Sequence, residues 1–191
     1  MKAVFEQIHD LAAPYQDKRD DDGHARITLE YALQLLALEG GDEDIVIPAI
    51  MLHDIGWSRV LDRDRLFDPA LTDTGEHDLR RRHQDEGVRL AADILKEVGY
   101  PPAQTEEILE IISEHDTRPG FISRNEGLVR DADKLWRFSA TGFAADVRRF
   151  GIARQARADE LTRALAQPKF IFSVSARRLA QEELESRRAG R

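Results

Sequence analysis

The sequence lacks cysteine altogether: none occurs among its 191 residues. Disulfide bonds, thiolate nucleophiles and cysteine-ligated zinc are therefore excluded, and the composition suits a reducing cytoplasm, which is the location we expect. Any metal would have to be held by His, Asp and Glu. Ligands of that kind favour Fe, Mn, Co, Ni, Mg or Zn in a site built from nitrogen and oxygen.

Long hydrophobic runs are missing as well. The longest one, residues 45–52, is interrupted by Pro48 and is too short to span a bilayer. The first ten residues, MKAVFEQIHD, include acidic side chains and no long apolar stretch, so we expect no signal peptide. Basic residues are in deficit, since 28 Lys and Arg face 36 Asp and Glu for a net charge of −8. This balance argues against a general nucleic-acid binder.

Strand-like alternation is also absent, because apolar residues recur at helical spacing along nearly the whole chain. Hydrophobic residues make up 41% of the sequence, which is enough to bury a core. The sequence thus predicts an all-α protein with a single domain over residues 1–191. Residues 58–76 are expected to form a long functional loop, or a loop with one short helix. The predicted helices lie around residues 4–11, 27–38, 45–52, 79–98, 103–114 and 128–138, with two or three more toward the end.

Four His-Asp pairs occur in the sequence, and one of them has an unusual setting. His53-Asp54 directly follows the apolar run IVIPAIML and directly precedes Ile55-Gly56. Burying two polar side chains without partners costs several kcal/mol, so something must satisfy them. A metal ion would do so. The plainer alternative is a hydrogen-bonded pair at the end of a helix.

Further candidate ligands follow on other predicted helices: His24, His83, His115 and Asp133. Taken singly, His24 suits a capping or surface position and His83 a solvated helix face. His115 follows an apolar helix face, and Asp133 lies between apolar residues that mark another. Asp131 competes with Asp133 as a ligand. Two residues apart on a helix point about 200° apart, so only one of the two faces a common site easily.

At these positions the chain resembles the HD-domain superfamily of metal-dependent phosphohydrolases. The signature is His24, then His53-Asp54 within LHDIG, then Asp133 within DADKL, and the resemblance covers about residues 23–149. It implies a compact helical bundle of the HD-domain type, followed here by a C-terminal helical extension. The ADKL wording favours Asp133 over Asp131.

His83 and His115 lie between the His-Asp pair and the last Asp, which resembles the branch of the superfamily that holds two metals. The implied cofactor is therefore one or two divalent metal ions. His9 lies outside the signature, and His77 is the alternative to His83 if the register of its helix differs. By this resemblance the first metal is bound by His24, His53, Asp54 and Asp133, the second by His83 and His115, and both are bridged by Asp54.

The implied activity is hydrolysis of a small phosphate ester, with a nucleotide among the candidates, as a phosphomonoesterase or a phosphodiesterase. A divalent metal lowers the pKa of bound water, so that hydroxide exists near neutral pH and no side-chain nucleophile is needed. The expected partner is a small phosphate-containing molecule, with no general nucleic-acid binding and no membrane.

Phosphate recognition needs Arg or Lys near the metals. Lys134 directly follows one proposed ligand, and Arg118 lies three residues after another. These two are the predicted phosphate-binding residues, and with Asp54 they make up the predicted catalytic set. The arginines at 80–82, just before His83, are further candidates. Ordinary surface charge is the alternative for each, since charged residues make up 34% of the chain.

Two other functions use the same residues differently. A mixed-valent diiron oxygenase of the same superfamily would keep the ligands but require redox-active iron. A non-catalytic helical binding module would be expected to have lost some of the ligand positions, whereas all six are filled here. Hydrolysis is the leading hypothesis, because it is the commoner reaction in the superfamily that the chain resembles.

Overall fold

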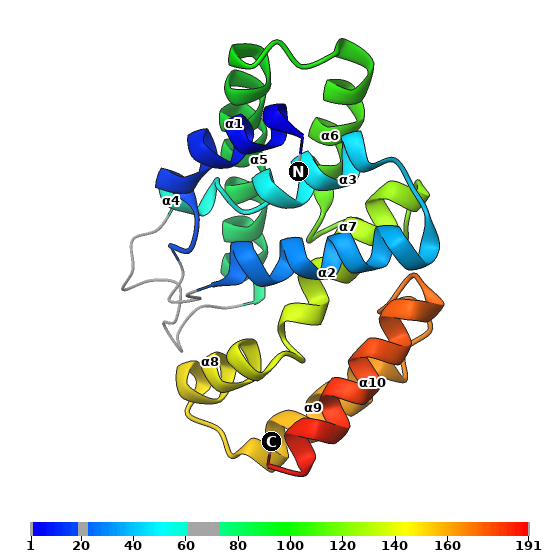
Figure 1. Ribbon diagram of the computed structural model, residues 1–191. Coiled ribbons are helices and arrows are strands. Elements are labelled where there is room, and N and C mark those ends of the chain that lie inside the picture. Colours follow the sequence, from blue (N-terminus) through cyan, green and yellow to red (C-terminus); the bar gives the residue numbers. More distant parts are fainter. Residues whose placement is uncertain (1, 19–22, 61–72, 191) are drawn as a thin grey trace.

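The computed structural model describes residues 2–18, 23–60 and 73–190. Every regular element in these ranges is a helix (Figure 1), which confirms the predicted all-α fold. None of the described helices is long and apolar enough to cross a membrane. The elements are α1 (Ala3–Ala12), η1 (Ala13–Tyr15), α2 (His24–Glu39), α3 (Glu43–Leu52), α4 (Trp57–Val60), α5 (Asp73–Glu97), α6 (Pro102–Glu114), α7 (Arg124–Trp136), α8 (Ala140–Phe150), α9 (Arg154–Leu165) and α10 (Val174–Arg188).

Helix α3 lies at the centre of the bundle formed by α1 to α7. It packs against α1, α2, α6 and α7, while α2 also lies along α7 and α5 along α6. Every residue of α3 from Ile45 to Leu52 is buried. A helix that is apolar on all sides has to be surrounded by other helices, and this one is.

The ends of α3 determine where the His-Asp pair lies. At its start, the Asp42 side chain accepts a hydrogen bond from the backbone N–H of Asp44 (2.9 Å), as an N-cap does. At its end, His53 is the C-cap residue, and Asp54 follows in the turn before α4. The buried helix therefore carries both polar side chains into the interior of the bundle.

Helix α5 begins earlier than the apolar pattern predicts. The periodic apolar residues start at Leu79, whereas the helix runs from Asp73 to Glu97. His77 and Asp78, in its first turns, are exposed, so these turns need no apolar face that a sequence pattern could reveal. The predicted loop over residues 58–76 is shorter for the same reason. Its start forms α4, and residues 61–72 lie outside the described part of the chain.

Helices α8, α9 and α10 form the C-terminal extension (Figure 1). α9 packs against α8 and α10, and α10 packs against α7 and α2. Their buried side chains, such as Phe143, Leu161 and Leu179, belong to the same apolar cluster as those of α3. The described parts of the bundle and of the extension therefore share one apolar cluster, and the single domain over residues 1–191 stays a prediction.

Candidate metal centre

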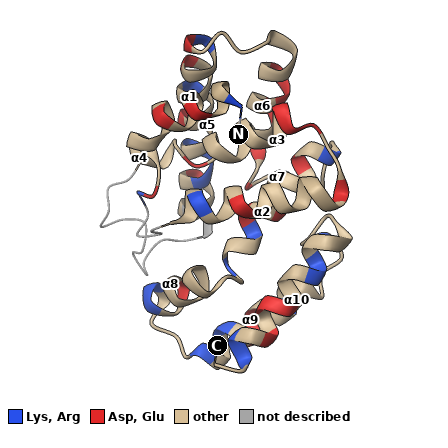
Figure 2. Ribbon diagram, in the orientation of Figure 1, with Lys and Arg blue, Asp and Glu red and all other residues tan. Residues whose placement is uncertain are grey.

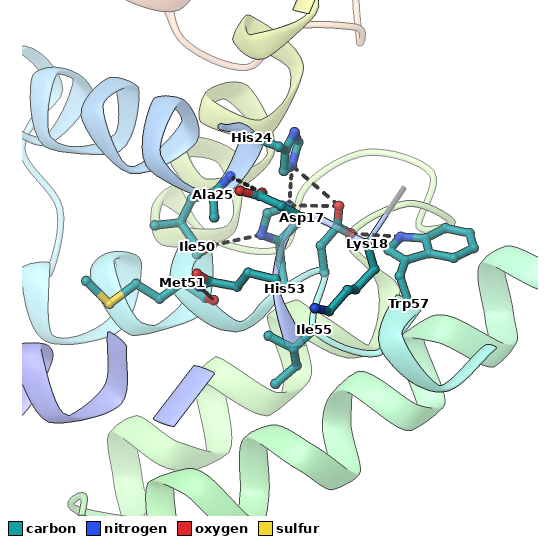
Figure 3. Close-up of a pocket in the computed structure, with 11 residues that line it drawn as sticks. Asp17, Lys18, His24, Ala25, Ile50, Met51, His53, Ile55 and Trp57 are labelled. Atoms are coloured by element: carbon teal, nitrogen blue, oxygen red, sulfur yellow. Dashed lines mark hydrogen bonds and ion pairs between the residues drawn. The ribbon is translucent and has the colours of Figure 1, made fainter. Parts of the chain in front are cut away.

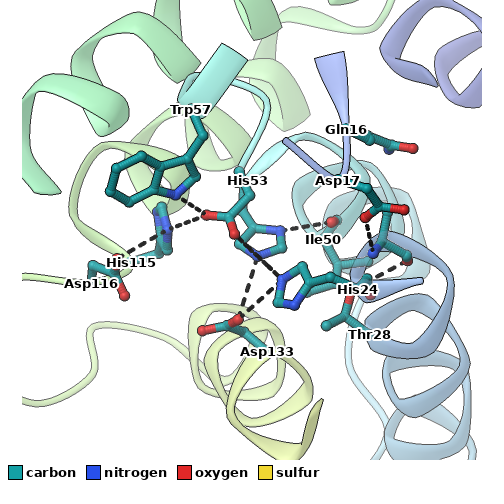
Figure 4. A network of polar contacts seen from close by, with 12 residues as sticks. Gln16, Asp17, His24, Thr28, Ile50, His53, Trp57, His115, Asp116 and Asp133 are labelled. Carbon is teal, nitrogen blue, oxygen red and sulfur yellow. Dashed lines mark hydrogen bonds and ion pairs between the residues drawn. The ribbon is translucent and has the colours of Figure 1, made fainter. Parts of the chain in front are cut away.

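The side chains predicted as metal ligands come from the ends and inner faces of five helices. The four histidines are buried and the two aspartates are half-buried. Figure 4 shows the labelled members of this group pointing toward one another across the gap between their helices. The six are His24 (α2), His53 and Asp54 (after α3), His83 (α5), His115 (after α6) and Asp133 (α7).

The position of His24 is fixed by a cap on α2. The carboxylate of Asp17 accepts hydrogen bonds from the backbone N–H groups of Gly23 (3.2 Å) and Ala25 (3.0 Å). N–H groups at a helix start have no partner within the helix, so this cap stabilises the first turn, which carries His24. Sequence reasoning missed Asp17, because it is several residues away from the helix that it caps.

The first group of donor atoms comprises His24 Nε2, His53 Nε2, Asp54 Oδ2 and Asp133 Oδ1. The two nitrogens are 3.3 Å apart. His24 Nε2 lies 3.4 Å from each of the two oxygens, and His53 Nε2 lies 3.6 Å from that of Asp54 and 3.5 Å from that of Asp133. A regular tetrahedron with edges of about 3.4 Å has its centre about 2.1 Å from each corner, which is a normal distance from a metal to imidazole or carboxylate ligands. This first donor set therefore fits one ion.

A second group of donors shares Asp54 with the first. Nε2 of His83 and Nε2 of His115 are 3.3 Å apart, and they lie 3.6 and 3.4 Å from Asp54 Oδ1. Asp54 thus turns one carboxylate oxygen toward each set, as a bridging ligand would. Asp116 Oδ2 lies nearby, 3.6 Å from His83 Nε2 and 3.9 Å from His115 Nε2. The described residues therefore contain two donor sets that could each hold an ion.

Two of the imidazoles are oriented by backbone carbonyls. His53 Nδ1 lies 2.8 Å from the carbonyl oxygen of Ile50, and His115 Nδ1 lies 2.8 Å from that of Ile112. A carbonyl oxygen only accepts, so both Nδ1 atoms carry the proton and donate. In the neutral ring the lone pair is then on Nε2, the atom that faces the centre. Hydrogen bonds of this kind usually hold metal-binding histidines in place.

The charges of the first donor set stabilise one another in the absence of an ion. Burial lowers the pKa of His53, but the carboxylates of Asp54 and Asp133 outweigh that effect and raise it to about 10. Burial raises the pKa of Asp133, yet the hydrogen bond and charge of His53 bring it well below its usual range. Strongly shifted pKa values of buried carboxylates and imidazoles are typical of functional sites, and a divalent ion bound here would displace the protons of the histidines.

Trp57, the first residue of α4, contacts both donor sets through Asp54 and His83. Its indole Nε1 donates a hydrogen bond to Asp54 Oδ1 (3.2 Å), and its ring stacks on that of His83 with 3.9 Å between centroids and 10° between planes. Trp57 is buried, and it also orients two of the predicted ligands.

A close approach of two backbones holds α5 against the turn after α3. A Cβ atom on Gly56 would lie 1.9 Å from the backbone oxygen of His83 and 2.4 Å from the backbone nitrogen of Gly87. Only glycine fits at position 56, because backbone atoms cannot move aside as a flexible side chain can. The glycine of LHDIG is therefore needed to bring His83 of α5 next to Asp54.

A cavity of about 80 Å³ opens beside the donors. Its lining includes the donor residues His24, Asp54 and Asp133 together with residues of the α7–α8 region. Figure 2 shows Lys and Arg positions at the end of α7 and at the far end of α8. The remaining lining residues are three arginines, two carboxylates and two aromatic residues: Arg80, Arg137, Arg149, Asp116, Asp146, Trp136 and Phe150.

The structure does not place the two cations predicted to bind phosphate in this cavity. The guanidinium of Arg118 pairs with Glu110, Glu114 and Glu126 instead. The amine of Lys134 donates to the backbone oxygen of Phe170 (2.7 Å), which directs it toward the C-terminal extension. Lys134 is next to Asp133 on α7, where adjacent residues point in different directions, whereas Arg118 lies beyond the end of α6.

Of the other candidates, only some reach the site. Arg80 lines the cavity, whereas Arg81 and Arg82 are exposed. His9 is exposed and pairs with Asp10, and His77 is exposed on the first turns of α5. His83, and not its alternative His77, therefore lies in the second donor set.

Asp131 and Asp133 face opposite ways, as their spacing predicts. Both oxygens of Asp131 accept backbone hydrogen bonds, from Phe172 N and Ser173 N at 2.8 Å each. Asp131 thus fastens the start of α10 to α7, and Asp133 alone of the pair faces the donors.

A second, small hollow of about 10 Å³ is lined by His24 and His53 of the first donor set together with Asp17 and residues of α3 (Figure 3).

The helical bundle and its six converging His and Asp donors define a class, namely all-helical proteins with a candidate metal centre. The HD domain family matches residues 21–137, which is more than half of the chain, so the protein belongs to the HD domain family. A similar solved structure is a predicted HD superfamily hydrolase from an uncultured Thermotogales bacterium. It is 21% identical, with a TM-score of 0.61 over 96% of this chain and 84% of that one, a likeness of fold. No curated protein matches.

Proposed function

We propose that this protein is a metal-dependent hydrolase that cleaves a small phosphate ester with an activated water. The observation that carries the proposal is the carboxylate of Asp54, whose two oxygens face two separate donor sets beside a cavity with three arginines. Divalent ions at these donors would supply Lewis acidity and a water that ionises near neutral pH. The solved structure of similar fold is described as a predicted hydrolase, which agrees with this reaction class.

Each residue of the site has a defined task in this proposal. His24, His53 and Asp133 would hold one ion and His83 and His115 the other, with Asp54 bound to both. Hydrogen bonds from the histidines to Ile50 and Ile112 keep the Nε2 atoms directed at the ions. The cavity lining among the described residues contains no Ser, Thr or Cys, so water is the nucleophile that the site offers.

A mixed-valent diiron oxygenase is the second candidate, because two histidine-rich donor sets bridged by one carboxylate would equally suit a pair of iron ions. The arginines of the cavity favour a phosphate ester as substrate for the hydrolase. The two reactions differ in what they consume: the oxygenase takes up dioxygen and the hydrolase takes up water.

The test begins with metal analysis of the purified protein. Phosphate release from aryl phosphates, diesters and phosphorylated metabolites is then measured with each candidate ion, together with oxygen uptake. We expect bound divalent metal and phosphate release without oxygen consumption. Asp54→Ala should lose both metal and turnover, whereas the matched exchange His9→Ala, at an exposed histidine, should change neither. Absence of metal, iron-dependent oxygen uptake, or full activity of Asp54→Ala would each overturn the proposal.

A further inference from the structure

The cavity beside the donors is also lined by basic residues that lie outside the predicted catalytic set. Arg137 follows α7 directly, and Arg149 lies near the end of α8. Both line the cavity together with Arg80 of α5. Guanidinium groups are planar and can donate two parallel hydrogen bonds to two oxygens of a phosphate group, so they are suited to bind phosphate beside a metal centre.

Of the two arginines, Arg137 gives the stronger indication of an anionic ligand. Its side chain is half-buried, and its guanidinium has no hydrogen-bond or ion-pair partner among the described residues. Burial lowers its pKa, but the carboxylates of Asp133, Asp146 and Asp116 raise it, so the group stays charged. A guanidinium has five N–H donors, and those of Arg137 lie at the cavity, where they are available to a ligand. An anionic ligand in the cavity would satisfy them.

Arg149 is held in place from two sides. Its guanidinium lies 3.7 Å from Asp146 Oδ1, one turn earlier on α8, and 5.9 Å from the ring centre of Trp136. The other oxygen of Asp146 is bound by Arg157 of α9. Asp146 is thus shared by two guanidinium groups and holds Arg149 in position beside the cavity, while Arg157 also pairs with Glu160.

The charge of the wall depends on whether the donors hold metal. The lining contains four aspartates and three arginines. Asp54 and Asp133 belong to the donor sets, and Asp146 lies between the guanidinium groups of Arg149 and Arg157. Divalent ions at the donors would offset the charge of Asp54 and Asp133, so that the loaded cavity favours an anion more than the metal-free one does.

We infer that Arg137 and Arg149 form an anion-binding subsite for the phosphoryl oxygens of the substrate. This inference rests on the proposed function in treating the cavity as the substrate site. It assigns substrate recognition to the α7–α8 region, at and beyond the end of the family match at residue 137. The ligand class is a phosphate or phosphate monoester dianion, and inorganic phosphate is its simplest probe.

The test is calorimetric titration of inorganic phosphate into the full-length, manganese-loaded protein. Arg137→Gln and Arg149→Gln should each weaken phosphate binding by about tenfold or more, as expected for losing a charge-assisted hydrogen bond. Arg148→Gln is the matched control, because it removes the same charge from the same helix at an exposed position. It should bind phosphate as the wild type does. Metal content and thermal unfolding are measured for every variant.

Arg137→Lys keeps the charge but loses the planar fork, and it provides a second variant if Arg137→Gln does not fold. It should bind phosphate more weakly than the wild type. The inference is overturned if the wild type does not bind phosphate, if the variants at 137 and 149 bind it normally, or if Arg148→Gln weakens binding equally. Loss of phosphate binding in these variants, in a protein that hydrolyses no ester, would uphold the subsite and reject the proposed hydrolase.

Discussion

The chain up to Asp133 and the chain from Arg137 onward contribute differently to the same cavity. The first part supplies both donor sets, from α2, α3, α5, α6 and α7. The second part supplies Arg137, Asp146, Arg149 and Phe150 to the wall. Ion binding and the proposed recognition of the anion therefore belong to successive segments, which mutations can separate.

The two parts are also held in place differently. Around the donors, helices pack through buried apolar faces and through the backbone contact at Gly56. The extension shares the apolar cluster, but α10 is also fastened by individual polar contacts, such as Asp131 to its first N–H groups and Tyr31 to Glu183 (3.1 Å). A single hydrogen bond contributes about 0.5–1.5 kcal/mol, so each of these contacts can be removed without unfolding the bundle.

The largest effect is expected from Gly56→Ala. The new methyl group would overlap backbone atoms of α5, which cannot relax as side chains do, so we expect a loss of more than about 3 kcal/mol in the free energy of unfolding. Chemical denaturation measures it. Gly87→Ala is the control on the facing helix. Its Cβ would meet Ile112 at 3.4 Å, an ordinary contact, and a helix-interior exchange of this type is neutral or stabilises by up to about 1 kcal/mol. Equal stability of the two variants would show that the backbone contact is not what holds α5.

The same region shows how much of the metal centre could be predicted from the sequence. His24, His53, Asp54 and Asp133 were predicted as ligands, and the structure brings all four together, because each follows or lies within an apolar helix whose buried face determines its direction. Gly56, inside the LHDIG motif, is explained only by the backbone of α5, which is distant in sequence.

The residues that line the cavity wall could not be predicted from the sequence. Arg118 was predicted because it follows His115, but its guanidinium is neutralised by three glutamates, two of them on α6 and one on α7. Arg137 and Arg149 carried no sequence signal, since arginine is common on solvated helix faces. Their place in the cavity depends on how α8 packs against α7 and α9, which is a tertiary property. The start of α5 was missed for a related reason, because its first turns are exposed and polar.

Asp131 and Asp133 offer a sharper separation of the two parts. Asp131→Asn should destabilise the protein by about 1–3 kcal/mol, because the amide nitrogen would face the backbone N–H of Phe172 or Ser173, just before α10, and leave it without an acceptor. Metal content should stay unchanged. Asp133→Asn should lose metal while the contact to α10 remains. Thermal unfolding and metal analysis of both variants test this, and loss of metal from Asp131→Asn would mean that the extension is coupled to the donors.

A smaller effect is expected from Trp57→Phe. Phenylalanine keeps a ring against His83 but removes the indole N–H that donates to Asp54 Oδ1. Loss of such an outer hydrogen bond typically weakens metal binding by about 10–100-fold, and the second donor set, which uses this oxygen, should be affected first. Titration of the metal-free protein should therefore show one binding step near the wild-type affinity and one weakened step. Two unchanged steps would indicate that Trp57 serves only packing.

The smallest effect concerns the contact between α2 and the extension. Glu39, at the end of α2, accepts a hydrogen bond from Ser175 N at the start of α10 (2.8 Å), and the hydrogen bonds of Ser175 lower its pKa below the ordinary value of 4.5. A carboxyl group whose pKa is lowered on folding adds stability above its unfolded pKa, and that stability is lost as the pH falls through the folded value. Glu39→Gln should thus reduce stability at pH 7 by less than about 1 kcal/mol, because solvent screens the interaction. In denaturation curves the difference from the wild type should decrease below pH 4.5 and vanish once the pH has fallen through the lowered pKa of Glu39. A difference that persists unchanged in acid would assign the effect to packing of the side chain, and α10 would then depend less on charge than the contact at Glu39 implies.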